Sequence, residues 1–329
     1  MGERAIELSP DNATGYVNLG ASLLTLNRLA DAEDAVRRAS ERNLDRPNLM
    51  LLRYDIAFVQ GDKAGMDREV AVAKGNSGAE DWMADHEAAA LAYAGELQQA
   101  RIMSQRAVAL AQQASHKQPA ALFETRAALR EAFFGNPQAA RASAERALQL
   151  SNAREVQYGA GLALAMSGDS SRADALGDDL SKNFPEDTSV RLSYVPVLRA
   201  QLALNRGRPG KALEELETAR HYELGTPRIC INGFYGAMYP VYLRGEAYFA
   251  ARQPDKAAIE FQEIVDHPGI VVSDPIAALA HLQLGRTYAI SGDKAKARSA
   301  YQDFLSVWRD ADSGIPVLKQ ARADYAKLQ

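Results

Sequence analysis

The chain has 329 residues, of which 47% are hydrophobic and 24% charged, and its formal net charge is -4 at pH 7. This composition supplies ample material for a buried core, and the lack of a basic block argues against nucleic acid as a ligand. The one cysteine, Cys230, excludes an internal disulfide and a thiolate zinc cage. No apolar run approaches the roughly 18 residues that a membrane-spanning helix needs, so we expect no membrane insertion by this chain.

Residues 1–12 lack the hydrophobic core of a secretory signal. Ala5, Ile6 and Leu8 are spaced as on one face of a helix, and Pro10 follows them. This pattern is typical of the end of a helix, not of the start of a domain. We therefore expect Met1 to open a fragment of a longer protein, with earlier domains before it.

From residue 13 onward the chain divides into pairs of amphipathic helices joined by short turns. In the clearest pair, 277–305, Leu284 and Tyr288 lie at helical spacing, the turn residue Gly292 interrupts the pattern, and a second helical pattern follows. Sliding this pattern along the sequence predicts about eight units. They lie near 13–46, 47–80, 81–115, 121–153, 154–187, 193–221, 238–267 and 278–309.

A column of small residues recurs through these units. At the position of Ala297 in the clearest unit, seven of the eight residues are alanine. The column reads Ala32, Met66, Ala100, Ala140, Ala173, Ala212, Ala257 and Ala297. A second column, at the position of Gly285, is small everywhere except at Tyr54. Small side chains let helix backbones approach closely, so we predict an all-α fold of antiparallel pairs in which each unit contacts mainly its neighbours.

One more amphipathic pattern follows the eighth unit, at residues 316–328. Leu318, Ala321 and Tyr325 fall on one side of this helix. A single extra helix at the end of such an array is expected to cap the apolar face that the last unit exposes.

The clearest unit resembles the tetratricopeptide repeat. His281, Leu284, Gly285, Tyr288 and, in the second helix, Ala297 and Tyr301 match the W-x2-L-G-x2-Y…A-x3-F pattern of that family. The resemblance covers nearly the whole chain. It implies a right-handed superhelical solenoid of about eight repeats that acts as a non-catalytic scaffold for protein interactions, with no cofactor and no metal.

A second resemblance covers residue 242 to the C-terminus. The segments DHPGI (266–270) and VLKQARADYAKL (317–328) look like the carboxyl end of bacterial serine/threonine protein kinases that carry tetratricopeptide repeats. It implies a kinase before residue 1, although related arrays also follow winged-helix or cyclase modules. The kinase motifs themselves, a glycine-rich loop, V-A-I-K, H-R-D and D-F-G, do not occur here, so we expect no enzymatic activity from this chain. A cytoplasmic location is preferred, unless the parent protein has a membrane span before the repeats.

The family resemblance also implies a concave groove lined by the first helix of each unit. The family positions that face this groove fall here on Trp82, Tyr93, Tyr158, Tyr194, Tyr242, Phe249 and Arg286. Such side chains suit a protein or peptide ligand, but they are equally suited to packing between repeats. The carboxylate clamp of some members is not present, since Val17 and Ala21 occupy its positions. Self-association into a homo-oligomer is the structural alternative.

The largest departure from the repeat pattern is the segment 221–239. It contains four aromatic residues that we expect to contact a ligand or a second copy of the chain, and these are Tyr222, Phe234, Tyr235 and Tyr239. The alternative is an extended helix pair that covers the sixth unit. Exposure of these side chains would decide between the two.

Four polar residues, Asp81, Asp85, His86 and Glu87, form the densest group of oxygen and imidazole ligands in the sequence. A metal site is conceivable, but no second helix supplies a matching histidine. We interpret the group as a solvated acidic helix start that is favourable to the helix dipole. A hydrolytic role for Asp85 and His86 is the weakest functional hypothesis.

Overall fold

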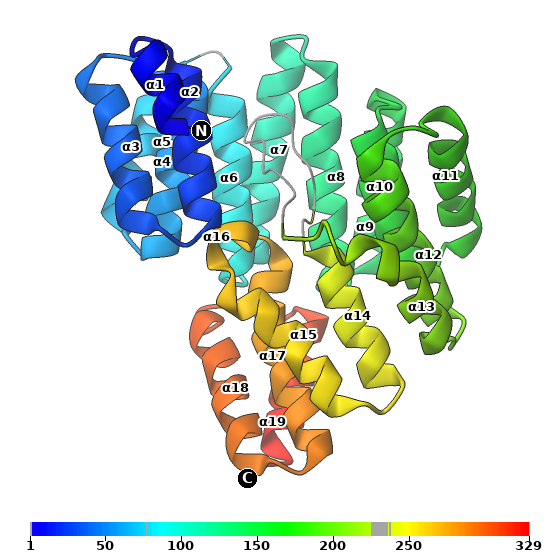
Figure 1. Cartoon of the computed structure of the whole chain (residues 1–329). Coiled ribbons are helices and arrows are strands. Elements are labelled where there is room, and N and C mark those ends of the chain that lie inside the picture. The colour runs from blue at the N-terminus through cyan, green and yellow to red at the C-terminus, as the bar shows by residue number, and fades with distance from the viewer. Residues whose placement is uncertain (1, 77, 225–235, 237, 329) are drawn as a thin grey trace.

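The computed structural model describes residues 2–76, 78–224, 236 and 238–328, and within these ranges the chain forms helices and no strand. The predicted all-α class is confirmed. Figure 1 shows an arch of helices at the top and right, built from α1 to α13. Their bounds are α1 Gly2–Leu8, α2 Ala13–Thr25, α3 Leu29–Glu41, α4 Pro47–Gln60, α5 Lys63–Ala73, α6 Glu80–Tyr93, α7 Leu97–Gln113, α8 Lys117–Phe133, α9 Pro137–Leu150, α10 Arg154–Met166, α11 Ser170–Asn183, α12 Val195–Asn205 and α13 Pro209–Leu216. A π-helical turn, Val190–Tyr194, leads into α12.

A second group of helices, which we call the C-terminal block, lies below the arch in Figure 1. Its elements are α14 Tyr239–Ala250, α15 Pro254–Asp266, the short α16 Pro268–Val271, α17 Pro275–Ser291, α18 Lys294–Val307 and α19 Pro316–Ala326. The expected capping helix is α19. Its Leu318 and Ala321 are buried, and the Arg286 Nε on α17 lies 3.3 Å from the Asp324 Oδ2 on α19.

The turn inside each helix pair requires a residue in the left-handed backbone region. Glycine has no Cβ and accepts this conformation without steric cost, which is why it ends most of the first helices. The glycines with positive φ at these turns are Gly61, Gly95, Gly135, Gly168, Gly207 and Gly292. Asn27 (φ 56°) and Arg252 (φ 57°) take this place in the pairs α2/α3 and α14/α15.

The small-residue columns lie where helices of a pair touch. All seven alanines of the first column are at most 1% exposed. A Cβ added at Gly245 would come within 2.6 Å of the Phe261 ring, and one added at Gly285 within 2.8 Å of the Tyr301 ring. The close approach predicted from these columns is therefore confirmed, and it allows successive pairs to stack as a helical solenoid.

Besides the contacts between successive units, the C-terminal block makes contacts with distant units that the repeat pattern does not predict. The block docks on the edge of the arch that is formed by the turns inside its helix pairs. At the first turn, the Asn27 Nδ2 donates to the Asp266 carbonyl at 2.9 Å and the Gly269 N–H donates to the Asn27 Oδ1 at 3.0 Å. The side chain of Val272 belongs to the same buried cluster as the core of the first pair.

The third and fourth turns of the arch hold the other end of the block. Trp308, at the end of α18, donates from its Nε1 to the Tyr93 carbonyl at 2.9 Å. The Asp312 N–H donates to the Gly95 carbonyl at 3.0 Å, while its Oδ2 accepts from the Gln98 N–H at 2.7 Å. The ring of Trp308 also meets that of Phe134 edge-on, with centroids 5.0 Å apart. The block is thus fixed to the arch at both ends.

Candidate functional site

The first helices α6 and α10 carry the earliest of the predicted groove residues. Trp82 on α6 is 4% exposed and meets the Phe123 ring edge-on at 4.9 Å. The Arg126 guanidinium lies over the Trp82 ring, 5.6 Å from its centroid, which is favourable because the ring face is electron-rich. Trp82 therefore serves mainly as a packing residue between α6 and α8.

Tyr158 and Tyr194 form a stacked pair with ring centroids 4.1 Å apart and an interplanar angle of 10°. Their side chains are 0% and 1% exposed. Burial raises the pKa of Tyr158 well above its ordinary value of 10, because the phenolate would lose its hydration. The pair joins α10 to the turn before α12 and presents almost no surface to a partner.

The remaining predicted groove residues lie at the third turn and in the C-terminal block. Tyr242 is 5% exposed, packs edge-on against Phe133, and accepts a hydrogen bond at its hydroxyl from the Gln283 Nε2 at 3.1 Å. Phe249 and Tyr93 are half-buried, and Arg286 is half-buried and paired with Asp324. Packing accounts for the four buried aromatics, so a groove that a partner can reach depends on the other three residues.

The predicted contact loop is described only at its ends. Tyr222 is 50% exposed, in agreement with a surface position. Tyr239 is 2% exposed, and its hydroxyl donates to the Asp274 Oδ2 at 3.0 Å. Phe234, Tyr235 and Cys230 lie outside the described residues.

The interpretation of the acidic group on α6 as a solvated helix start is wrong. Asp81, Asp85 and His86 are 4%, 0% and 4% exposed, and the side chains beside Asp85 and His86 come from the neighbouring pairs, Arg126 on α8 and Asp55 on α4. Arg126 pairs with Asp85 and neutralises its charge. The His86 Nδ1 is 2.9 Å from the Trp82 carbonyl.

No cluster of three or more His, Cys, Asp or Glu side chains suited to a metal ion occurs among the residues that the structure describes. Within the same ranges, no helix has the length and apolar character needed to cross a membrane.

A pocket of about 190 Å³ that is lined mostly by apolar residues lies at the junction of the arch and the C-terminal block, and we call it the junction pocket. Tyr93 forms one wall and meets the Phe58 ring edge-on at 5.1 Å. His281 on α17 also lines the pocket, and burial lowers its pKa below the ordinary 6.5, so the neutral imidazole is favoured at pH 7. The other lining residues are Val59, Ile264, Val265, Pro268, Val271, Val272 and Ala277.

Sequence reasoning found Tyr93 but missed the rest of the junction pocket. Phe58 and Tyr93 come from adjacent pairs, whereas the residues opposite them come from the C-terminal block. The available signal was the apolar run Ile270 to Val272, which is unusual between two helices. An apolar inter-helix segment of this kind indicates that something covers it.

Comparison with known proteins agrees with this architecture. A family model described as "Tetratricopeptide repeat" matches residues 3–64, 197–269 and 242–316, more than half of the chain. No curated protein matches the chain. Among solved structures, a tetratricopeptide repeat protein from Parabacteroides merdae is 15% identical, with 84% of this chain and 97% of that chain covered and a TM-score of 0.45. Yeast Tom70 is 13% identical, with 99% of this chain and 90% of Tom70 covered and a TM-score of 0.38. On the extent of the family match, the chain belongs to the tetratricopeptide repeat family.

Proposed function

We propose that this chain is a docking region that holds a partner protein, and that the junction pocket receives an apolar side chain of that partner. The proposal rests on one observation, a preformed pocket between two parts of the solenoid whose lining residues are mostly apolar. Tetratricopeptide folds are interaction scaffolds, and pockets that bury one or two anchor side chains supply most of the affinity in such interfaces.

The chemistry of the pocket favours a leucine or an aromatic anchor. Phe58, Tyr93 and Val265 are half-buried, so part of each side chain still faces the pocket and would be covered by a ligand. Burying one such anchor is worth about 1.5–3 kcal/mol from apolar area alone. Neutral His281 adds no charge that would have to be desolvated.

Selection of displayed random peptides against the chain tests this proposal. We expect the selected peptides to share an apolar anchor, and to bind about tenfold more weakly to Ala277→Leu, whose larger side chain fills the pocket. Ala142→Leu, at an exposed position on α9, is the matched control. Peptides that bind Ala277→Leu and the parent chain equally well would show that the pocket is not the site.

We further propose that the docking region belongs to a bacterial serine/threonine protein kinase and acts in the cytoplasm. This part rests on the resemblance of residues 266–270 and 317–328 to the ends of such kinases. The reading frame upstream of Met1 tests it, because a frame without a kinase domain would remove the proposal and leave the docking function intact. Static light scattering tests the alternative of self-association, which a monomer at high concentration would exclude.

A further inference from the structure

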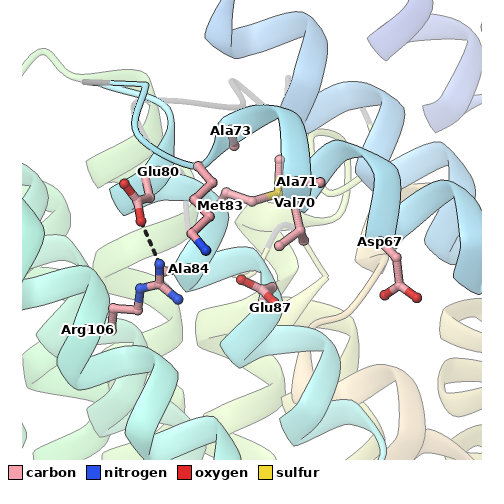
Figure 2. A pocket seen from close by; sticks show the side chains of 10 residues that line it. Asp67, Val70, Ala71, Ala73, Glu80, Met83, Ala84, Glu87 and Arg106 are labelled. Carbon is pink, nitrogen blue, oxygen red and sulfur yellow. Dashed lines mark hydrogen bonds and ion pairs between the residues drawn. The ribbon is translucent and has the colours of Figure 1, made fainter.

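A second pocket, of about 310 Å³, lies between the second helices α5 and α7 with α6 as its floor, and we call it the α5–α7 pocket. Figure 2 shows Met83 and Ala84 on the floor, with Val70 and Ala71 on the α5 wall. Met83 and Ala84 are each 1% exposed, so the floor is formed by the packed core of the third pair. Glu87 is the lining residue that belongs to the polar group singled out in the sequence.

Glu87 projects into the pocket from the apolar floor (Figure 2). Its side chain is half-buried, and its carboxylate makes no ion pair or hydrogen bond with another described residue. Burial raises the pKa of Glu87 above its ordinary value of 4.5, and the attraction of Arg106 and Lys63 does not offset this. A half-buried carboxylate without a partner is costly, and an opposite charge beside it would recover that cost.

The two cations that attract Glu87, Arg106 and Lys63, are ion-paired with other carboxylates. Arg106 is bound to Glu80, with its Nη2 2.5 Å from the Glu80 Oε1, as the dashed line in Figure 2 shows. Lys74, on the rim, lowers the pKa of Glu80 and has no resolved effect on Glu87. Asp67, at the mouth of the pocket, is paired with Lys63, whose Nζ lies 3.1 Å from the Asp67 Oδ1. Glu87 is therefore the lining carboxylate that no described cation pairs with.

We propose that the α5–α7 pocket binds a basic side chain, lysine or arginine, of a protein partner. The aliphatic stem of that side chain lies along Met83 and Val70, and its cationic head meets the carboxylate of Glu87. Basic side chains have this amphipathic form, with an apolar stem and a charged head. Charge-assisted hydrogen bonds to a partly buried carboxylate are stronger than those at an exposed one. The site is separate from the junction pocket, so the two proposals can fail independently.

The test uses small probes and the whole chain labelled with ¹³C at the methionine methyl groups, so that Met83 reports on the pocket floor. N-acetyl-arginine amide and N-acetyl-lysine amide are titrated at millimolar concentrations and followed by NMR, with the Met83 signal assigned from Met83→Leu. We expect a saturable shift of the Met83 methyl signal with at least one of these probes. N-acetyl-citrulline amide has the shape of arginine without its charge. Its binding should be weaker than that of the arginine probe by a factor of about five or more.

Glu87→Gln keeps the size of the side chain and removes its charge, so we expect about fivefold weaker binding of the cationic probe. Glu145→Gln, an exposed carboxylate on α9 that pairs with Arg172, is the matched control and should bind like the parent chain. A Met83 signal that neither cationic probe moves would overturn the proposal. Equal binding by the parent and Glu87→Gln chains, or by the citrulline probe, would also overturn it. Circular dichroism of both variants checks that they fold.

Discussion

Docking of the C-terminal block on the arch can be tested at Gly269 of α16. A Cβ added there would lie 1.8 Å from the Leu24 carbonyl oxygen and 2.9 Å from the Asn27 Oδ1. Both obstacles belong to the first turn of the arch, and no backbone strain is involved because Gly269 does not have a positive φ. Gly269→Ala is therefore compatible with α16 itself and incompatible with its docking.

The size of the effect follows from these contacts. An ordinary contact begins at 3.4 Å, so α16 would have to move by about 1.6 Å, which would break both hydrogen bonds to Asn27. Overpacking of this kind costs about 1–3 kcal/mol, and each lost hydrogen bond about 1 kcal/mol. We expect docking to weaken by about 3–5 kcal/mol, which raises the undocked fraction about 150- to 5,000-fold.

Amide hydrogen exchange followed by mass spectrometry can measure this increase in the undocked fraction. Faster exchange is expected in peptides that cover α16 and the turn at Asn27, while α10 and α11 on the far side of the arch stay unchanged. Gly210→Ala is the control, because a Cβ at that helical glycine meets nothing within 4 Å. Asn27→Gly, which keeps the left-handed backbone, should reproduce part of the effect. If α16 and the turn at Asn27 exchange at the same rate in the Gly269→Ala and Gly210→Ala variants, the contacts described here do not hold α16 in place.

Four further substitutions have expected outcomes. Arg244→Met should lower the free energy of unfolding by about 3–5 kcal/mol, because the buried Glu223 and Glu260 lose the guanidinium that they share. Urea unfolding measures this change, and an unchanged urea midpoint would contradict the pairing. Tyr158→Phe should not lower the melting temperature, since its buried hydroxyl has no hydrogen-bond partner among the described residues, whereas Tyr242→Phe should cost about 1 kcal/mol. The pKa of His281 is lower in the folded chain than in the unfolded chain, so as the pH falls the imidazole binds a proton first in the unfolded chain. The free energy of unfolding should therefore decrease below about pH 6.5. His281→Gln should remove that part of the pH dependence in urea titrations.

The helix pairs were predictable from the sequence because their determinants are local. Alanine at position 297 and glycine at 285 act on helices that are joined by a short turn, so their spacing in the sequence reports directly on packing. The turn glycines likewise mark a backbone conformation that depends on one residue. Pattern reasoning works here because each of these contacts joins residues of the same repeat.

Docking of the block was not predictable in this way. The hydrogen bond from Gly269 to Asn27 joins residues 242 positions apart, and the one from Trp308 to Tyr93 spans 215 positions. No periodicity connects such pairs, because a solenoid pattern specifies only its own neighbours. Asp85 and His86 were assigned to a solvated surface because the sequence pattern does not reveal their partners in the neighbouring pairs, Arg126 on α8 and Asp55 on α4.

This arrangement changes how a groove mutation must be interpreted. Tyr242→Ala would truncate a side chain that is 5% exposed, at a cost of about 3–5 kcal/mol, so loss of partner binding would follow from damage to the block alone. Tyr242→Phe keeps the ring and most of the packing, and Phe249 is half-buried, so Phe249→Leu changes a surface that a partner can reach. A partner that binds the block directly should therefore respond to Phe249→Leu and tolerate Tyr242→Phe. If binding tolerates both but is lost in Gly269→Ala, the partner depends on the docked state of the block and not on these aromatic side chains.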